Sequence, residues 1–165
     1  MTVNYCNRTA RRTWTGTLMA LVILLSGCGN GNSIPDELAP GQEPYLRWCA
    51  SCHGNAGEGK PPAFPPLAGS EWLELPDEGL AMIILYGLRG EIEVAGRTYR
   101  GYMPPMQHLS DQDIAEVVVF MLQQWGERES DFDEADANRL REVFQGRRPP
   151  LEGWEGVQDA LGELP

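Results

Sequence analysis

The motif Cys49-Ala50-Ser51-Cys52-His53 constrains this chain more than any other part of its sequence. Two cysteines three positions apart, with a histidine directly after the second, have the spacing of covalent haem attachment through two thioether bonds. The cysteines then fix the macrocycle, and the histidine binds the iron through Nε2. The motif therefore predicts one haem c, attached by Cys49 and Cys52, with His53 as an axial ligand.

A zinc site and a redox-active dithiol use the same residue types and remain open alternatives. Zinc sites have about four ligands, and downstream of residue 28 only His108 is left as another good nitrogen or sulfur donor. A thioredoxin-like dithiol lies in a βαβ setting, and the sequence shows no such alternation. Either alternative predicts a colourless protein.

The first 27 residues have the features of a secretory signal peptide. Arginines at positions 8, 11 and 12 precede an apolar run at 18–25, which is too short to span a bilayer. The run ends in Leu25-Ser26-Gly27-Cys28, which resembles the lipobox at which bacterial lipoproteins are cleaved and lipidated. We therefore expect residues 1–27 to be removed and Cys28 to carry a membrane anchor, with an ordinary signal peptide as the alternative. The rest would be exported and face the periplasm or the cell exterior.

The chain is acidic, with a formal net charge of −11. Loss of residues 1–27 removes three arginines and no acidic residue, which takes the charge to −14. Such a surface argues against a nucleic-acid partner and favours either docking to basic patches on another protein or simple solubility.

Helical patterns concentrate in residues 43–126, which we expect to form the folded domain. The clearest helix begins after Ser110 as N-cap, has acidic residues in its first turn, continues with an apolar stripe and ends at Gly126. The predicted elements are, in order, a helix from about Glu43 into the cysteine pair, a loop at 54–69, a helix at 77–88, a short hairpin around Ala95-Gly96 and the helix at 110–126.

The segments on either side of this domain have weaker patterns. Residues 28–42 are rich in glycine, asparagine and proline, and we interpret them as the lipidated N-terminus and a flexible linker. Residues 127–165 are expected to form an accessory helix at 133–145 and then a loosely held acidic tail at 146–165, with at most one helical turn near 156–161.

Two groups of residues resemble landmarks of the class I c-type cytochromes. The opening pattern comprises Gly41, Tyr45, the haem-attachment motif, Gly54, Gly57 and Gly59, and the closing pattern is Tyr102-Met103-Pro104-Pro105-Met106 followed by Leu109-Ser110-Asp111 and the last helix. The resemblance extends from about Gly41 to Trp125. It implies an all-α cytochrome c fold with a minor β-hairpin around one covalently bound haem.

The resemblance also implies the remaining contacts of the haem. A methionine before the C-terminal helix supplies the sixth iron ligand in this family, and Met103 has that position, with Met106 as the alternative and His108 as a third candidate. Pro65-Pro66-Leu67 resembles the Pro-x-Leu element, in which the Pro65 carbonyl accepts a hydrogen bond from the axial histidine and Leu67 lies against the haem.

The functional expectation is a one-electron carrier and not an enzyme, with no small-molecule substrate. A haem enzyme or gas sensor would need an open or displaceable sixth ligand, and both remain alternatives. A finer resemblance links the chain to cytochrome domains that accompany quinoprotein dehydrogenases, copper nitrite reductases or terminal oxidases, which suggests the kind of redox partner. We interpret Trp48, Trp72 and Trp125 as core residues in preference to an electron relay.

Overall fold

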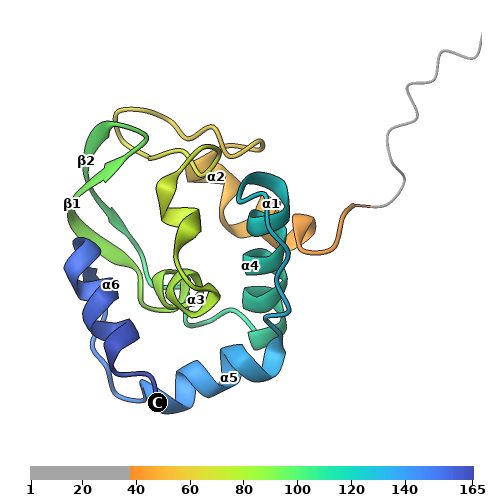
Figure 1. The fold of residues 1–165 in the computed structure, drawn as a ribbon. Helices are drawn as coiled ribbons and strands as arrows, with labels where there is room; N and C mark the ends of the chain where they lie inside the picture. Colours follow the sequence, from red (N-terminus) through yellow and green to blue (C-terminus); the bar gives the residue numbers. More distant parts are fainter. Residues whose placement is uncertain (1–37) are drawn as a thin grey trace, which may run out of the picture. The chain divides into compact units, whose positions relative to one another are not determined.

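The computed structural model describes residues 38–165, so the predicted signal peptide, the predicted lipidation site at Cys28 and most of the predicted linker lie outside the described residues. The elements are α1 (Gln42–Trp48), α2 (Ala50–His53), η1 (Glu71–Glu74), α3 (Asp77–Tyr86), β1 (Leu88–Val94), β2 (Arg97–Met103), α4 (Asp111–Trp125), α5 (Glu134–Val143), β3 (Leu151–Glu152) and α6 (Gly153–Gly162) (Figure 1). The fold is mostly helical with one small sheet, as the sequence predicts. None of the helices in the described part is long and apolar enough to cross a membrane.

Helices α1 and α4 lie against each other at a glycine. Gly41 has φ 77°, and a Cβ there would lie 2.1 Å from the carbonyl oxygen of Glu116. Because the helices approach so closely, the ring of Tyr45 packs against the rings of Phe120 and Trp125, with centroid separations of 5.4 and 5.1 Å. Because a larger residue at position 41 would separate the helices, this glycine fixes the packing of the haem-attachment segment on α4.

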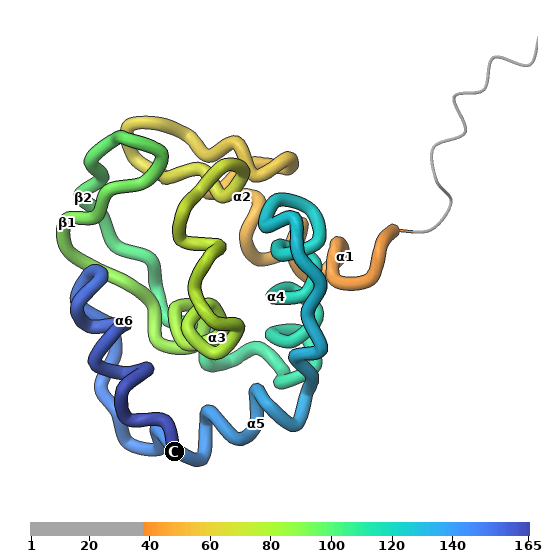
Figure 2. Tube along the Cα trace, in the orientation of Figure 1, coloured from red at the N-terminus to blue at the C-terminus, as the bar shows by residue number. Residues whose placement is uncertain are grey.

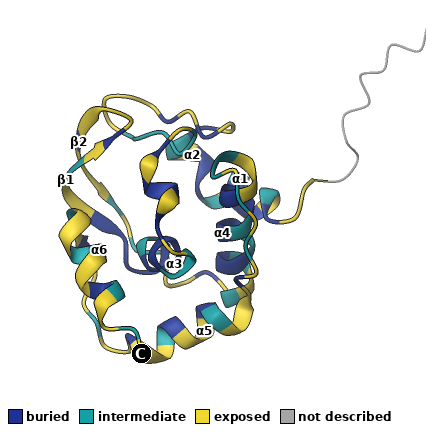
Figure 3. Cartoon of the chain, viewed as in Figure 1, coloured by how far each residue is buried: buried dark blue, intermediate teal, exposed yellow. Residues whose placement is uncertain are grey.

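Helix α4 has the boundaries that its sequence signals predict. The Ser110 hydroxyl accepts a hydrogen bond from the backbone N–H of Asp113, which satisfies one of the free donors at the helix N-terminus. Its apolar side is buried against α1 and α3, and Figure 3 shows the buried faces of α3 and α4 turned toward the interior.

The hairpin is longer than the short one expected from sequence. Strands β1 and β2 pair antiparallel from Leu88 opposite Met103 to Val94 opposite Arg97. The connection at Ala95-Gly96 has φ values of 50° and 70°, the geometry of a two-residue type I′ turn. The register brings Met103 next to the end of α3, although the two are well separated in sequence.

The C-terminal segment is not the loosely held tail that the sequence suggests. Strand β3 pairs in parallel with β1, with Leu88 opposite Leu151, and α6 packs on α3 and β1. Leu151, Val157 and Ala160 are buried. Figure 2 traces this segment from α4 through α5 to α6 beside β1. The prediction failed because a two-residue strand and a glycine-containing helix carry too little local pattern to reveal a long-range contact.

Candidate functional site

A single cavity of about 330 Å³ collects the residues that the sequence singles out. Its lining comes from α1 and α2, the 54–69 loop, η1, α3, both hairpin strands, the segment that follows them and α4. The predicted site residues in the lining are Cys49, Cys52, His53, Pro65, Leu67, Met103 and Met106. The fold therefore brings together, around one apolar space, residues from both ends of the predicted domain.

Cys49 is the N-cap of α2 and Cys52 lies within it, and both are free thiols. Cys49 is buried, and burial raises the pKa of its thiol to about 12, with a smaller contribution from the neighbouring Cys52. A reactive dithiol requires a lowered pKa, because the thiolate is the nucleophile. The environment of Cys49 is therefore unlike that of a thioredoxin-type pair.

The imidazole of His53 is oriented by a backbone carbonyl. Its Nδ1 lies 3.0 Å from the carbonyl oxygen of Pro65, so an Nδ1–H donates to that oxygen and Nε2 is left for a metal. Burial lowers the pKa of His53, and the hydrogen bond to Pro65 opposes this only in part. The neutral ring that results is the form in which histidine binds iron.

The loop that carries Pro65 folds back onto α2 through backbone hydrogen bonds. Gly59 N–H donates to the carbonyl of His53 at 2.7 Å, and Leu67 N–H donates to that of Gly57 at 2.8 Å. Gly57 has φ 72°, and a Cβ there would lie 2.7 Å from the ring of Trp125. The glycines are thus required for the loop to approach both α2 and α4, and this approach sets the position of the Pro65 carbonyl.

The two candidate methionines reach the cavity from the end of β2 and from the segment that follows it. Met103 ends β2, and both Met103 and Met106 are half-buried and line the cavity. The backbone N–H of Met106 donates to the carbonyl of Ile84 at 2.9 Å, which attaches the segment to α3. His108 is exposed, and its ring packs edge-on against Trp48 at 5.1 Å between centroids.

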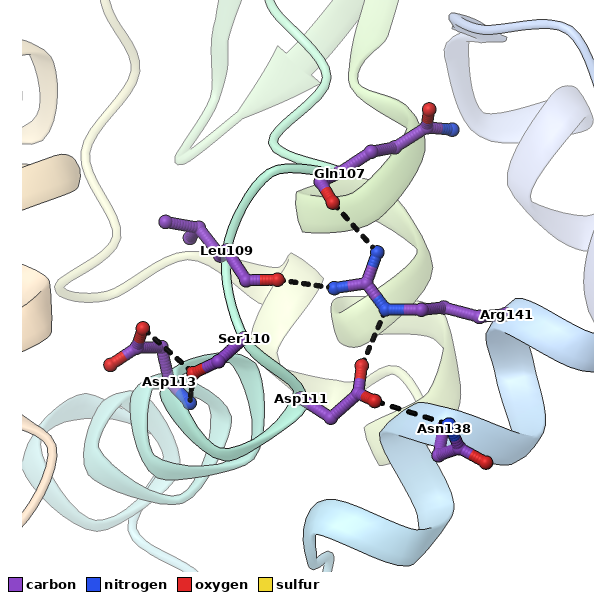
Figure 4. Close-up of polar contacts among 7 residues, drawn as sticks. All are labelled: Gln107, Leu109, Ser110, Asp111, Asp113, Asn138 and Arg141. Carbon is purple, nitrogen blue, oxygen red and sulfur yellow. Dashed lines mark hydrogen bonds and ion pairs between the residues drawn. The ribbon is translucent and has the colours of Figure 1, made fainter.

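An arginine from the C-terminal segment holds the chain after these methionines (Figure 4). Arg141 of α5 donates to the carbonyl of Gln107 at 2.8 Å and to that of Leu109 at 2.5 Å, and it pairs with the carboxylate of Asp111. Asn138 donates to the other oxygen of the same carboxylate at 3.2 Å. Sequence analysis missed this cluster, because α5 and the 107–111 segment are about 30 positions apart and no local motif links them.

The residues around the cavity fit a covalently held haem. The lining supplies two thiols, an imidazole with a free Nε2 and a thioether in a mostly apolar surround. The indole N–H of Trp48, which also borders the cavity, is the only buried side-chain nitrogen or oxygen of residues 38–165 without a hydrogen-bond partner. In the same residues, no group of three or more His, Cys, Asp or Glu side chains is placed to bind a metal ion, as the zinc alternative would require.

Comparison with known proteins identifies the family. The sequence profile of the family named Cytochrome c matches residues 38–125, which is more than half of the chain. The chain belongs to the cytochrome c family. Its cofactor is accordingly a covalently bound haem c, with Cys49 and Cys52 in the attachment region, and the zinc and dithiol alternatives are wrong.

Two curated proteins show which members of the family this cytochrome is similar to. It is 40% identical over 115 residues to cytochrome c-552 of Thermus thermophilus, an alignment that covers 67% of this chain and 72% of that protein. It is also 38% identical over 106 residues to the cytochrome c subunit of the quinone alcohol dehydrogenase of Gluconobacter oxydans, where the match covers 62% of this chain but 20% of the subunit. Both relatives are electron-transfer cytochromes, so electron transfer is the general function of this family member.

Proposed function

We propose that this cytochrome is a one-electron carrier whose haem iron is ligated by His53 and Met103. The observation that supports the proposal most directly is that one cavity is bordered by both side chains and by both haem-attachment cysteines. When bound, the haem supplies the iron(II)/iron(III) couple. Cys49 and Cys52 hold it in place, and the Pro65 carbonyl keeps the proton of His53 on Nδ1.

The proposed methionine keeps the sixth position closed to water and other small ligands. A thioether opposite an imidazole raises the reduction potential relative to two imidazoles. The choice of Met103 over Met106 is supported by the family position of the methionine and by its place at the end of β2. The peptide of Met103 lies against Gly87, where a Cβ would come within 2.4 Å of the Met103 carbonyl oxygen.

The make-up of the cavity favours a carrier over an enzyme or a gas sensor. In the described residues, His53 is the one histidine in the lining, and no aspartate or glutamate is present there. A peroxidase-like reaction needs distal groups that accept and donate protons. Ligation by Met103 would also leave no open iron position.

The proposed setting is a membrane surface outside the cytoplasm. Residues 1–27 would direct export, and the lipid on Cys28 would anchor a cytochrome domain that remains in water. Its partners would be redox proteins of the dehydrogenase, nitrite reductase or terminal oxidase kind. The similarity to a subunit of a quinone alcohol dehydrogenase supports the dehydrogenase kind. Membrane fractionation of the Cys28→Ser variant tests the anchor, since recovery in the membrane fraction as for the unmodified protein would contradict it.

The ligand test is the visible spectrum of the haem-loaded protein, recorded oxidised, reduced and under carbon monoxide. We expect low-spin iron with the weak methionine–ferric band and no reaction with carbon monoxide. The band should disappear in Met103→Ala and persist in the matched control Met106→Ala. Loss of the band only in Met106→Ala would assign that residue instead. High-spin iron that binds carbon monoxide in the unmutated protein would reject the carrier in favour of an enzyme or sensor.

A further inference from the structure

An exposed tryptophan on the C-terminal helix is in contact with a wall of the haem cavity. Trp154 of α6 is 46% exposed, which is unusual for so large an apolar side chain. Its ring packs edge-on against Trp72, with centroids 5.1 Å apart and an interplanar angle of 88°. Trp72 is buried and lines the cavity. Two indole rings in contact thus extend from the solvent to the haem cavity.

The inner ring of this pair is fixed in place. The indole N–H of Trp72 donates to the carbonyl of Glu93 at 2.9 Å, and the Ser70 hydroxyl accepts from its backbone N–H at 3.2 Å. Helix α6 packs against both α3 and β1. The contact between the rings is therefore held by the fold on both sides and does not depend on one mobile side chain.

The surface next to Trp154 is rich in carboxylates. Glu91 and Glu93 of β1, Glu152 of β3 and Glu155 in the first turn of α6 are all exposed. Glu91 pairs with Arg100 and Glu152 with Arg89, whereas Glu93 and Glu155 make no ion pair within residues 38–165. A partially exposed aromatic ring among carboxylates is a surface that suits a basic protein.

We propose that Trp154 and the neighbouring carboxylates of β1 and α6 form an electron-exchange surface for a redox protein with a basic patch, coupled to the haem through Trp72. Tryptophan is the side chain most enriched among the residues that dominate protein interfaces. The carboxylates would steer a basic partner to this face at low ionic strength. Trp72 thus becomes both a core residue, as the sequence suggested, and part of a relay.

The proposal rests on the proposed function, because it needs haem iron that accepts and returns one electron. In the reducing direction the partner's centre loses one electron, and iron(III) in the cavity becomes iron(II). The two indoles are neither oxidised nor reduced. Their two π-systems are in contact and take the place of solvent or saturated side chains between partner and haem. An electron tunnels more readily through such π-systems.

The experiment uses the haem-loaded protein and, as probe partner, a small basic mono-haem cytochrome c of higher potential. Electron transfer from the reduced protein to this probe is followed by stopped flow over a range of ionic strengths. The variants are Trp154→Ala, Trp154→Phe, which keeps an aromatic ring against Trp72, and the control Val143→Ala, which removes another exposed apolar side chain from α5. The midpoint potential and thermal midpoint of each variant are measured in parallel.

At low ionic strength we expect the second-order rate constant to fall about tenfold or more in Trp154→Ala, the loss typical of a central interface residue. Trp154→Phe should retain most of the rate, Val143→Ala all of it, and no variant should change the midpoint potential. In the unmutated protein, the probe should shift the NMR amide signals of α6 and β1.

Amide shifts confined to Tyr102 and Met103, which line the cavity, or an unchanged rate in Trp154→Ala, would overturn the proposed surface. Failure of the proposed function would look different, because the unmutated protein would then not be reversibly reduced by a small reagent.

Discussion

The substitution Arg141→Ala tests whether α5 stabilises the segment that follows the candidate axial methionines. The Arg141 side chain is 27% exposed, and its guanidinium donates to two carbonyls and a carboxylate. A hydrogen bond from a charged group is worth roughly 1.5–3 kcal/mol, and partial exposure reduces this range. For the three contacts together we expect a loss of about 3 kcal/mol in the free energy of unfolding. For the 128 residues from 38 to 165 this corresponds to roughly 11 °C in Tm.

Two measurements on the haem-loaded protein follow this change. Urea titration gives the free energy of unfolding, and hydrogen exchange reports the protection of the amides at 106–111, which should fall more than that of α1. Arg141→Lys keeps the positive charge but lacks the several N–H donors of the planar guanidinium. It should therefore lose only about half as much unfolding free energy as Arg141→Ala. The control is Arg148→Ala, since Arg148 is exposed and has no ion pair within residues 38–165. Equal stability of Arg141→Ala and Arg148→Ala would refute the reasoning.

Two further substitutions test the packing around α2. Gly57→Ala should lower the free energy of unfolding by about 2–4 kcal/mol, measured by urea titration, because its φ of 72° is left-handed and its Cβ would meet Trp125. A cost as small as that of Gly146→Ala, whose Cβ would meet nothing within 4 Å and whose φ is 84°, would refute the clash. Tyr45→Phe should cost about 1–2 kcal/mol by losing the 2.6 Å hydrogen bond to the Gly54 carbonyl. Burial raises the pKa of Tyr45 above its usual value near 10, so the folded state binds this proton more tightly and loses stability as the pH rises beyond about 10. Alkaline titration of the unfolding midpoint should show a smaller fall in the Phe variant, and identical alkaline curves would contradict this assignment.

The sequence predicted those parts of the fold in which several nearby residues indicate the same structure. Helix α4 has a capping serine, an apolar stripe and a terminal glycine, and all three act within a few residues of one another. The haem-attachment motif is equally local, since it consists of α2 and its N-cap Cys49. Here the chemistry of neighbouring side chains was sufficient to predict the structure.

The parts that the sequence did not predict depend on contacts between distant segments. Strand β3 has two residues and exists because β1 offers an edge to Leu151, more than 60 positions away. The contacts of Arg141 with the 107–111 segment and of Trp154 with Trp72 are equally invisible in sequence. Arg141 joins the C-terminal segment to the chain that follows the methionines, and Trp154 joins it to Trp72, which lines the cavity. The local patterns around both residues resemble those of ordinary surface residues.

These long-range contacts change how the C-terminal segment is understood. Arg128 pairs with Asp77 and donates to the carbonyl of Leu75, and the Tyr86 hydroxyl donates to the carbonyl of Phe144, so both ends of α3 are attached to it. Arg141 holds the chain after the methionines, and β3 extends the hairpin. Since α3, the hairpin and the methionine segment are walls of the cavity, the residues beyond α4 stabilise the haem site although none of them lines it. Stability of the haem site and access for a partner at Trp154 would then depend on the same segment.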